Sequence, residues 1–180
     1  MILDGLKKNL FKFYIWIGQN RSNLISEASV GFENSKTIGI LYNSMHHKIP
    51  CFVVDFENDI KNMGKVVSSL CYTNKVDISS DTSSISYGDF NILGDVKNKI
   101  FAEFINHNFD YLYHLDLESN ILVDYILTKS KAKCRVGSFQ ANRIGFYEIM
   151  INLKQDTNNN RRNDSIKLIA EQMLHFTKML

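Results

Sequence analysis

Short apolar runs alternate with amphipathic stretches through the middle of the chain. Residues 37–42 (TIGILY) are mostly apolar without polar alternation, which is typical of a strand buried on both faces of a parallel sheet. After Pro50, which suits the first turn of a helix, apolar residues recur at helical spacing across residues 52–63. Residues 65–72 (KVVSSLCY) then have the pattern of a second strand. This order predicts two parallel strands joined by a right-handed helical crossover.

The same alternation continues toward the C-terminus. Residues 74–89 are mostly polar, with room for one edge strand. The later predicted elements are a helix capped by Asp95, a strand at residues 109–117, a helix capped by Ser119 or Asn120, strands at residues 134–139 and 147–153, and a last helix capped by Asp164 or Ser165. Alternating strands and helices predict an α/β fold, specifically a Rossmann-like three-layer α/β/α sandwich with a mostly parallel sheet of about five strands.

The two terminal segments have the spacing of amphipathic helices. An N-terminal helix is expected over residues 1–17, ended by Gly18. Its expected apolar face consists of Leu3, Leu6, Leu10, Phe13 and Ile17. The last helix is expected to bury Ile166, Ile169, Met173, Phe176 and Leu180. We therefore expect residues 1–36 to form a helix and a linker, and residues 37–180 to form a single Rossmann-like domain that includes the C-terminal helix.

Composition and charge restrict the class of protein. The chain has 180 residues, 44% of them hydrophobic, which suits one domain around one core. Its 21 basic and 19 acidic residues leave a net charge of +2, so bulk charge gives no support for a nucleic-acid partner. Three cysteines without close spacing fit reduced thiols in a cytoplasmic protein. The apolar run near the N-terminus is too short for a membrane span or a signal peptide.

Polar residues follow two of the predicted strands, at the end where parallel sheets bind ligands. Asn43 and Ser44 come after the first strand, and Asp116 and Ser119 lie at the carboxyl end of the strand that ends at residue 117. We expect these four residues to line a ligand site. The loop after the first strand has no glycine, so it is neither a Walker loop nor a dinucleotide-binding fingerprint. Two structural alternatives involve no ligand. The loop after the first strand is then a plain connection, and Asp116 begins the helix cap at Ser119.

Neither a metal site nor a carboxylate pair is expected. His46 and His47 are adjacent and lack the i, i+3 or i, i+4 spacing of metal ligands on a helix, so no metal and no cofactor is predicted. The other three histidines are expected to be surface imidazoles: His107, His114 and His175. Asp110 and Asp116 share one side of a strand but lie roughly 20 Å apart at ~3.3 Å per residue. That separation is too large for a glycosidase pair.

No catalytic nucleophile is expected either. The three cysteines fall within predicted strands or helices, where buried thiols are usually inert, and no serine has a GxSxG context. A basic cluster near the middle of the chain is interpreted mainly as a solvated helix end, although it carries enough charge to contact phosphate. It consists of Lys129, Lys131, Lys133, Arg135 and Arg143.

The segments FDYLYHLDL and SKAKCRVGSF, separated by a helix, resemble the first domain of bacterial lipopolysaccharide heptosyltransferases of glycosyltransferase family 9. That resemblance covers residues 37–153 and implies a fold and a shared ancestry. The family holds its nucleotide-sugar donor largely with a second α/β domain, for which these residues leave no room. It also has a glycine-rich first loop with an acidic base where this sequence has YNSMHH, so no catalytic residue is carried across. The entire chain also resembles an uncharacterised family of short Bacteroidetes proteins.

These observations favour a non-enzymatic cytoplasmic binding or interaction protein with a degenerate Rossmann-like domain. The alternative is an enzyme or half-enzyme, related to glycosyltransferases, that binds a phosphorylated sugar or a nucleotide beside Ser44, Asp116 and Ser119. A second alternative is a peripheral membrane protein anchored by the lysine-bearing N-terminal helix, although docking of that helix on its own domain or on a partner is favoured. The expected partners are a second copy of the chain or another protein.

Overall fold

The computed structural model describes residues 2–22, 31–43, 49–73, 84–90, 98–152 and 162–180. Six parallel strands form one sheet in the order β3-β2-β1-β4-β5-β6. They are β1 (Thr37–Asn43), β2 (Val66–Thr73), β3 (Ser84–Ser86), β4 (Tyr111–Leu115), β5 (Cys134–Ser138) and β6 (Ile149–Ile151). This is the strand order of doubly wound Rossmann-type sheets, in which the chain reverses its direction of progress between β1 and β4. The predicted fold class is confirmed, with one strand more than expected.

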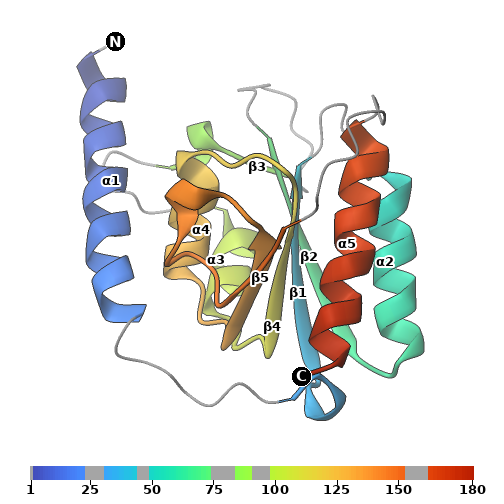
Figure 1. Cartoon of the computed structure of the whole chain (residues 1–180). Coiled ribbons are helices and arrows are strands. Elements are labelled where there is room, and N and C mark those ends of the chain that lie inside the picture. The colour runs from blue at the N-terminus through green and yellow to red at the C-terminus, as the bar shows by residue number, and fades with distance from the viewer. Residues whose placement is uncertain (1, 23–30, 44–48, 74–83, 91–97, 153–161) are drawn as a thin grey trace.

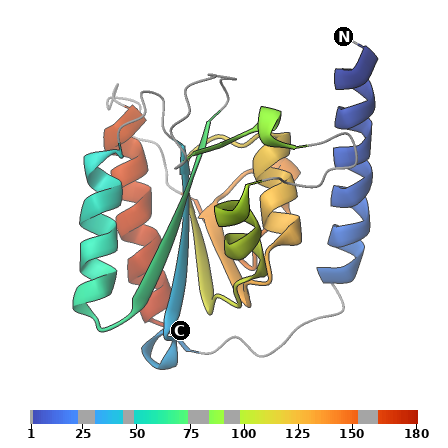
Figure 2. The same cartoon turned by 180° about the vertical axis from the view of Figure 1, so that it is seen from behind.

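Helices cover both faces of the sheet (Figure 1). Helices α2 (Cys51–Asn62) and α5 (Arg162–Lys178) lie on one face, and α3 (Lys99–Asn106) and α4 (Ile121–Lys129) lie on the other. Helix α1 (Ile2–Ser22) packs against α4 and forms an additional layer outside it, as Figure 2 shows from behind. None of the described helices is both long enough and apolar enough to cross a bilayer.

The central strands divide the core into two parts. In β1, Ile38 and Ile40 belong to the core beneath α2 and α5, and Leu41 belongs to the core beneath α3 and α4. Because successive side chains of a strand point to opposite faces, an uninterrupted apolar run can serve both cores. Gly39 lies against Leu112 and Phe109, where an added Cβ would meet both side chains at 2.9 Å. The predicted strand buried on both faces is confirmed.

Helix boundaries follow local capping, with one correction. Pro50 is the N-cap of α2, and Gly64 follows its C-terminus with a φ of 76°, a conformation that favours glycine. The Asn98 side chain caps α3 by accepting a hydrogen bond from the Phe101 amide. Asn98 therefore takes the role predicted for Asp95, which lies outside the described residues. Asn120 caps α4, as the sequence predicted.

The predicted buried face of α1 was wrong at Phe13, which is exposed, whereas Phe11 and Ile15 are buried. Of the other predicted residues, Leu10 and Ile17 are half-buried, and the side chains of Leu3 and Leu6 lie outside the described ones. The helix also continues through Gly18, the predicted end, to Ser22. At Gly18 the absence of a side chain lets α1 approach Thr128 of α4 closely. Phe11 packs on Phe90 and on Tyr125 of α4, with ring centroids 5.0 and 4.5 Å away. Tertiary packing on an aromatic surface therefore decided which face is buried.

Helix α5 also departs from its predicted pattern near its end. Ile166, Ile169 and Met173 are buried as expected, but Phe176 and Leu180 are exposed. Thr177 is buried instead, and its hydroxyl hydrogen-bonds the Tyr113 hydroxyl of β4 at 2.7 Å. A polar contact to the sheet thus replaces the last apolar contact. Asp164 and Ser165 lie inside the first turn of α5, which begins at Arg162.

Candidate functional site

Two of the predicted site residues meet at the reversal point of the sheet. Tyr42 of β1 is in register with Leu115 of β4, so Asn43 and Asp116 follow at neighbouring carboxyl ends. In sheets of this strand order, ligands bind in the crevice outside these ends. Asn43 is half-buried there. Ser44 lies outside the described residues.

Asp116 is buried, with 1% of its surface exposed, and its carboxylate is used within the chain. Oδ1 accepts hydrogen bonds from the amides of Leu117 (2.7 Å) and Glu118 (3.2 Å). Oδ2 accepts a hydrogen bond of 2.9 Å from the Tyr72 hydroxyl of β2. The carboxylate therefore shapes the turn that leads from β4 toward α4, which is the kind of role that the structural alternative gave it.

A chain of buried hydrogen bonds continues from Asp116 across the sheet. The Tyr72 hydroxyl lies 3.0 Å from Nε2 of His114, and Nδ1 of His114 lies 2.8 Å from the Tyr147 hydroxyl. Because Tyr72 donates its one hydrogen to Asp116, Nε2 of His114 donates to Tyr72. When the imidazole is neutral, Nδ1 then accepts from Tyr147, and every group of the chain has a partner.

The electrostatic surroundings also favour neutral His114. Complete burial, against the opposing effect of Asp116 and with a smaller contribution from the positive charge of Arg143, lowers the pKa of His114 to about 4. Burial likewise raises the pKa of Tyr147, which keeps this hydroxyl protonated as a donor. The expectation of a surface imidazole was therefore wrong for His114, since a histidine between apolar residues of a predicted strand gives no sign of its buried partners.

A buried ion pair stabilises the first turns of α4. Arg143 is buried and forms an ion pair with Asp124 of α4. Burial raises the pKa of Asp124, an effect that Arg143 and the Ser119 hydroxyl oppose. Ser119 donates to Oδ1 of Asp124 at 3.2 Å. The hydroxyl predicted to contact a ligand is therefore engaged with its own helix.

The end of β5 holds the same loop from the other side. The Ser138 hydroxyl donates to the Asp116 carbonyl at 3.0 Å, and the Gln140 side chain donates to the Leu117 carbonyl at 2.6 Å. Gly137 of β5 lies so close to the Tyr147 ring that an added Cβ would overlap it. The loop that follows β4 is thus tied to β5 and to the residues just after it.

The predicted basic cluster does not form one surface. Arg135 is buried and pairs with Glu148. Lys133 pairs with Asp110 at 2.9 Å, and the Lys129 ammonium lies 4.6 Å from the Tyr14 ring centroid. These side chains have partners within the fold. The expectation of a solvated helix end was therefore wrong for the two arginines, because both reach into the core rather than into water.

Asp110 lies at the opposite end of the sheet from Asp116, as expected. Burial would raise the pKa of Asp110, but hydrogen bonds from the Lys36 and Thr37 amides and from Lys133 hold it at about 2. The Asp110 carboxylate thus joins the amino ends of β1 and β4. Its function is structural.

Metal ligands and thiols add little to the site. Among the described residues, no group of three or more His, Cys, Asp or Glu side chains is placed to hold a metal ion. His46 and His47 lie outside the described residues. Cys71 and Cys134 are buried, and burial raises the pKa of Cys134 to about 12. Cys51 is exposed, contrary to expectation, because it lies on the outer side of the first turn of α2.

The comparisons with known proteins match the chain to one family, whose function is unknown. The profile of DUF6913, a family of unknown function, matches residues 7–171. No curated protein and no solved structure matches the chain. The function must therefore be argued from the geometry.

Proposed function

We propose that this chain, which belongs to the DUF6913 family of unknown function, is a non-enzymatic cytoplasmic binding or interaction protein with a degenerate Rossmann-like domain. The proposal rests on the geometry of the site. The observation that carries this proposal is the state of Asp116. An acid, base or nucleophile has to reach its substrate within hydrogen-bond distance. Asp116 is 1% exposed, and both of its oxygens already accept hydrogen bonds from the chain.

The remaining polar groups at this end support the same proposal. The Ser119 hydroxyl is bound to Asp124, and Ser138 and Gln140 hold the backbone of the loop. Breaking such a buried network to free one group costs about 1–3 kcal/mol for each polar atom left unsatisfied. The network therefore favours a rigid scaffold over a reactive cleft.

The proposal is tested by thermal unfolding of the full chain with nucleotides, nucleotide sugars and sugar phosphates. A ligand that binds the native state raises the melting temperature. We expect no reproducible rise with any of these compounds. Asn43→Ala probes the reversal point, and Asn62→Ala, at the exposed end of α2, is the matched control. A rise that Asn43→Ala abolishes and Asn62→Ala retains would replace this proposal with the small-ligand alternative.

One observation favours a second candidate, a peripheral membrane protein. On the outer face of α1, Phe13 is 52% exposed and Trp16 is 62% exposed, with ring centroids 6.4 Å apart. Lys8 and Lys12 are exposed on the same helix. Aromatic side chains flanked by lysines are typical of helices that lie in the interface of an anionic bilayer.

The single tryptophan makes this second candidate directly measurable. If α1 enters an anionic interface, Trp16 fluorescence shifts to the blue with vesicles that contain phosphatidylserine, and less with pure phosphatidylcholine vesicles. Lys12→Glu should weaken that response, and Lys178→Glu, at the end of α5, is the matched control. An unchanged Trp16 spectrum with both vesicles would refute the membrane candidate.

A further inference from the structure

We propose that the outer edge of β2 binds an extended peptide segment of a partner protein, which adds to the sheet as a strand and places an apolar side chain in the pocket between β2 and α3. This inference rests on the proposed interaction function, for which it names a surface and a class of partner.

The first observation is a strand edge that no described residue covers. Among the described residues, β1 pairs with β2 from Val66 to Tyr72, whereas β3 pairs on the other side only from Cys71 to Thr73. The Val66 amide donates to β1 through the Lys36 carbonyl at 2.8 Å. Residues of a parallel strand form hydrogen bonds alternately to one side and to the other. Because Val66 bonds to β1, the peptide groups of Val67 and Ser69 point outward, away from β1.

The outward peptide groups are available to a partner. Within the part of the chain that the structure describes, the N–H and C=O groups of Val67 and Ser69 have no hydrogen-bond partner. Native proteins normally cover such an edge or protect it with charged side chains or proline, because it is a template for another strand. The sequence VVSS at the start of β2 carries none of these protective residues.

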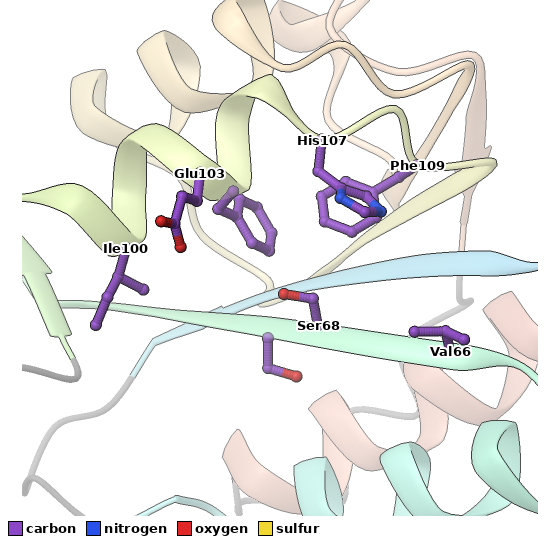
Figure 3. A pocket seen from close by; sticks show the side chains of 8 residues that line it. Val66, Ser68, Ile100, Glu103, His107 and Phe109 are labelled. Carbon is purple, nitrogen blue, oxygen red and sulfur yellow. The ribbon is translucent and has the colours of Figure 1, made fainter.

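The second observation is a pocket beside this edge (Figure 3). Its volume is about 230 Å³, and residues of β2, of α3 and of the turn that follows α3 line it. Ser68 points from β2 toward α3, and Glu103 and His107 face it from the other wall. Val66 and Ile100, which are 66% and 48% exposed, are apolar side chains at the opening. The pocket thus has exposed apolar side chains on both of its walls, one from β2 and one from α3.

Together the edge and the pocket specify the occupant. Donors and acceptors that alternate at strand spacing are matched by an extended polypeptide backbone, and pockets beside an edge strand select among its side chains. Glu103 is the one charged side chain among the lining residues; 67% of its side chain is exposed, and it lies 3.7 Å from the Lys99 ammonium on the same helix. An exposed ion pair of this kind is worth at most about 1 kcal/mol, so Glu103 can exchange Lys99 for a basic residue next to the apolar residue that enters the pocket. The partner segment is thus extended, with an apolar side chain beside a lysine or an arginine.

Charge disfavours a second copy of the chain as the occupant. Two copies of β2 paired antiparallel about Ser68 would be related by a two-fold axis perpendicular to the sheet. Both α3 helices would then lie on the same face, and the two Glu103 carboxylates would approach the shared edge. Like charges brought together in this way oppose association.

The experiment uses a random heptapeptide library on phage, selected against the full chain. Enriched peptides are synthesised with fluorescein and measured by fluorescence polarisation. We expect enrichment of peptides with an aliphatic or aromatic residue beside a basic one. We also expect amide exchange at Val67 and Ser69 to slow when the peptide is added, since these amides become donors to the peptide.

Two variants separate this site from any other. Val67→Pro removes an outward N–H without removing a hydrogen bond to β1, and proline is tolerated at such edge positions. It should weaken peptide binding by at least about tenfold, whereas Val67→Thr should not. Glu103→Lys on the surface of α3 should weaken binding of the basic peptides without affecting folding. If Val67→Pro does not fold, Glu103→Lys and amide exchange still decide the question.

Several results would overturn the inference. It is wrong if no peptide is enriched, or if the enriched peptides bind Val67→Pro and Glu103→Lys as tightly as the unchanged chain. It is also wrong if sedimentation shows a dimer that Val67→Pro dissociates, because the second copy is then the occupant. A rise in melting temperature with a small ligand that Asn43→Ala abolishes would overturn the proposed function instead. The inference about β2 would still be decided by the peptide measurements.

Discussion

Acidification through the pH range between 6.5 and about 4 should destabilise this protein, because folding holds His114 neutral. Burial, with a further contribution from Arg143, lowers the pKa of His114 from its ordinary value of 6.5 to about 4, although Asp116 opposes this change. Between these two values the unfolded chain binds a proton that the folded chain does not. The free energy of unfolding therefore rises with pH across this window and is lost as the pH falls.

The magnitude follows from the two pKa values. At 1.36 kcal/mol for each pH unit, full protonation of the unfolded state costs about 3 kcal/mol of stability by the time the pH reaches about 4. That is a large part of the ~5–15 kcal/mol that stabilises a typical domain. Asp110, with its pKa of about 2, acts in a separate window, since its contribution is lost only as the pH falls below its ordinary value of 3.8.

The assay is urea unfolding at a series of pH values from 7 down to 4.5, with His114→Gln as the comparison. The variant loses hydrogen bonds and is less stable at pH 7, but it should also lose most of the pH dependence in this range. Imidazole titration by NMR gives an independent value for His114. A His114 pKa near 6.5, or equal pH dependence in the two proteins, would refute the reasoning.

Three further outcomes test the buried chain and the thiols. Gly137→Ala should destabilise the protein by about 1–3 kcal/mol in urea unfolding, because its Cβ overlaps the Tyr147 ring, whereas Gly5→Ala, which has open space, should not. Tyr72→Phe should cost about 1–3 kcal/mol in the same assay, since it leaves buried polar partners without a hydrogen bond. In the native state one thiol, Cys51, should react rapidly with Ellman's reagent, and all three should react in urea; rapid reaction of a second native thiol would contradict the burial of the other cysteines.

Local pattern determined most of the architecture. The apolar run of β1, the proline before α2 and the glycine after it specify a β-α-β unit from neighbouring residues alone. Parallel pairing follows because a crossover helix returns the chain to the same end of the sheet, and such a crossover has one favoured handedness. The position of Asp116 at the carboxyl end of β4 also followed from the sequence, because it depends only on where an apolar run stops.

The tertiary structure decided which side chains meet. The buried face of α1 depends on Phe90 and Tyr125, which are distant in sequence, so helical spacing alone selected the wrong residues. The roles of Tyr72, His114 and Tyr147 depend on the order of β2, β4 and the segment after β5 across the sheet. Burial and hydrogen-bond partners arise from such long-range contacts. A sequence pattern therefore places a polar residue at a site, but only the fold determines whether that residue faces a ligand or its own chain.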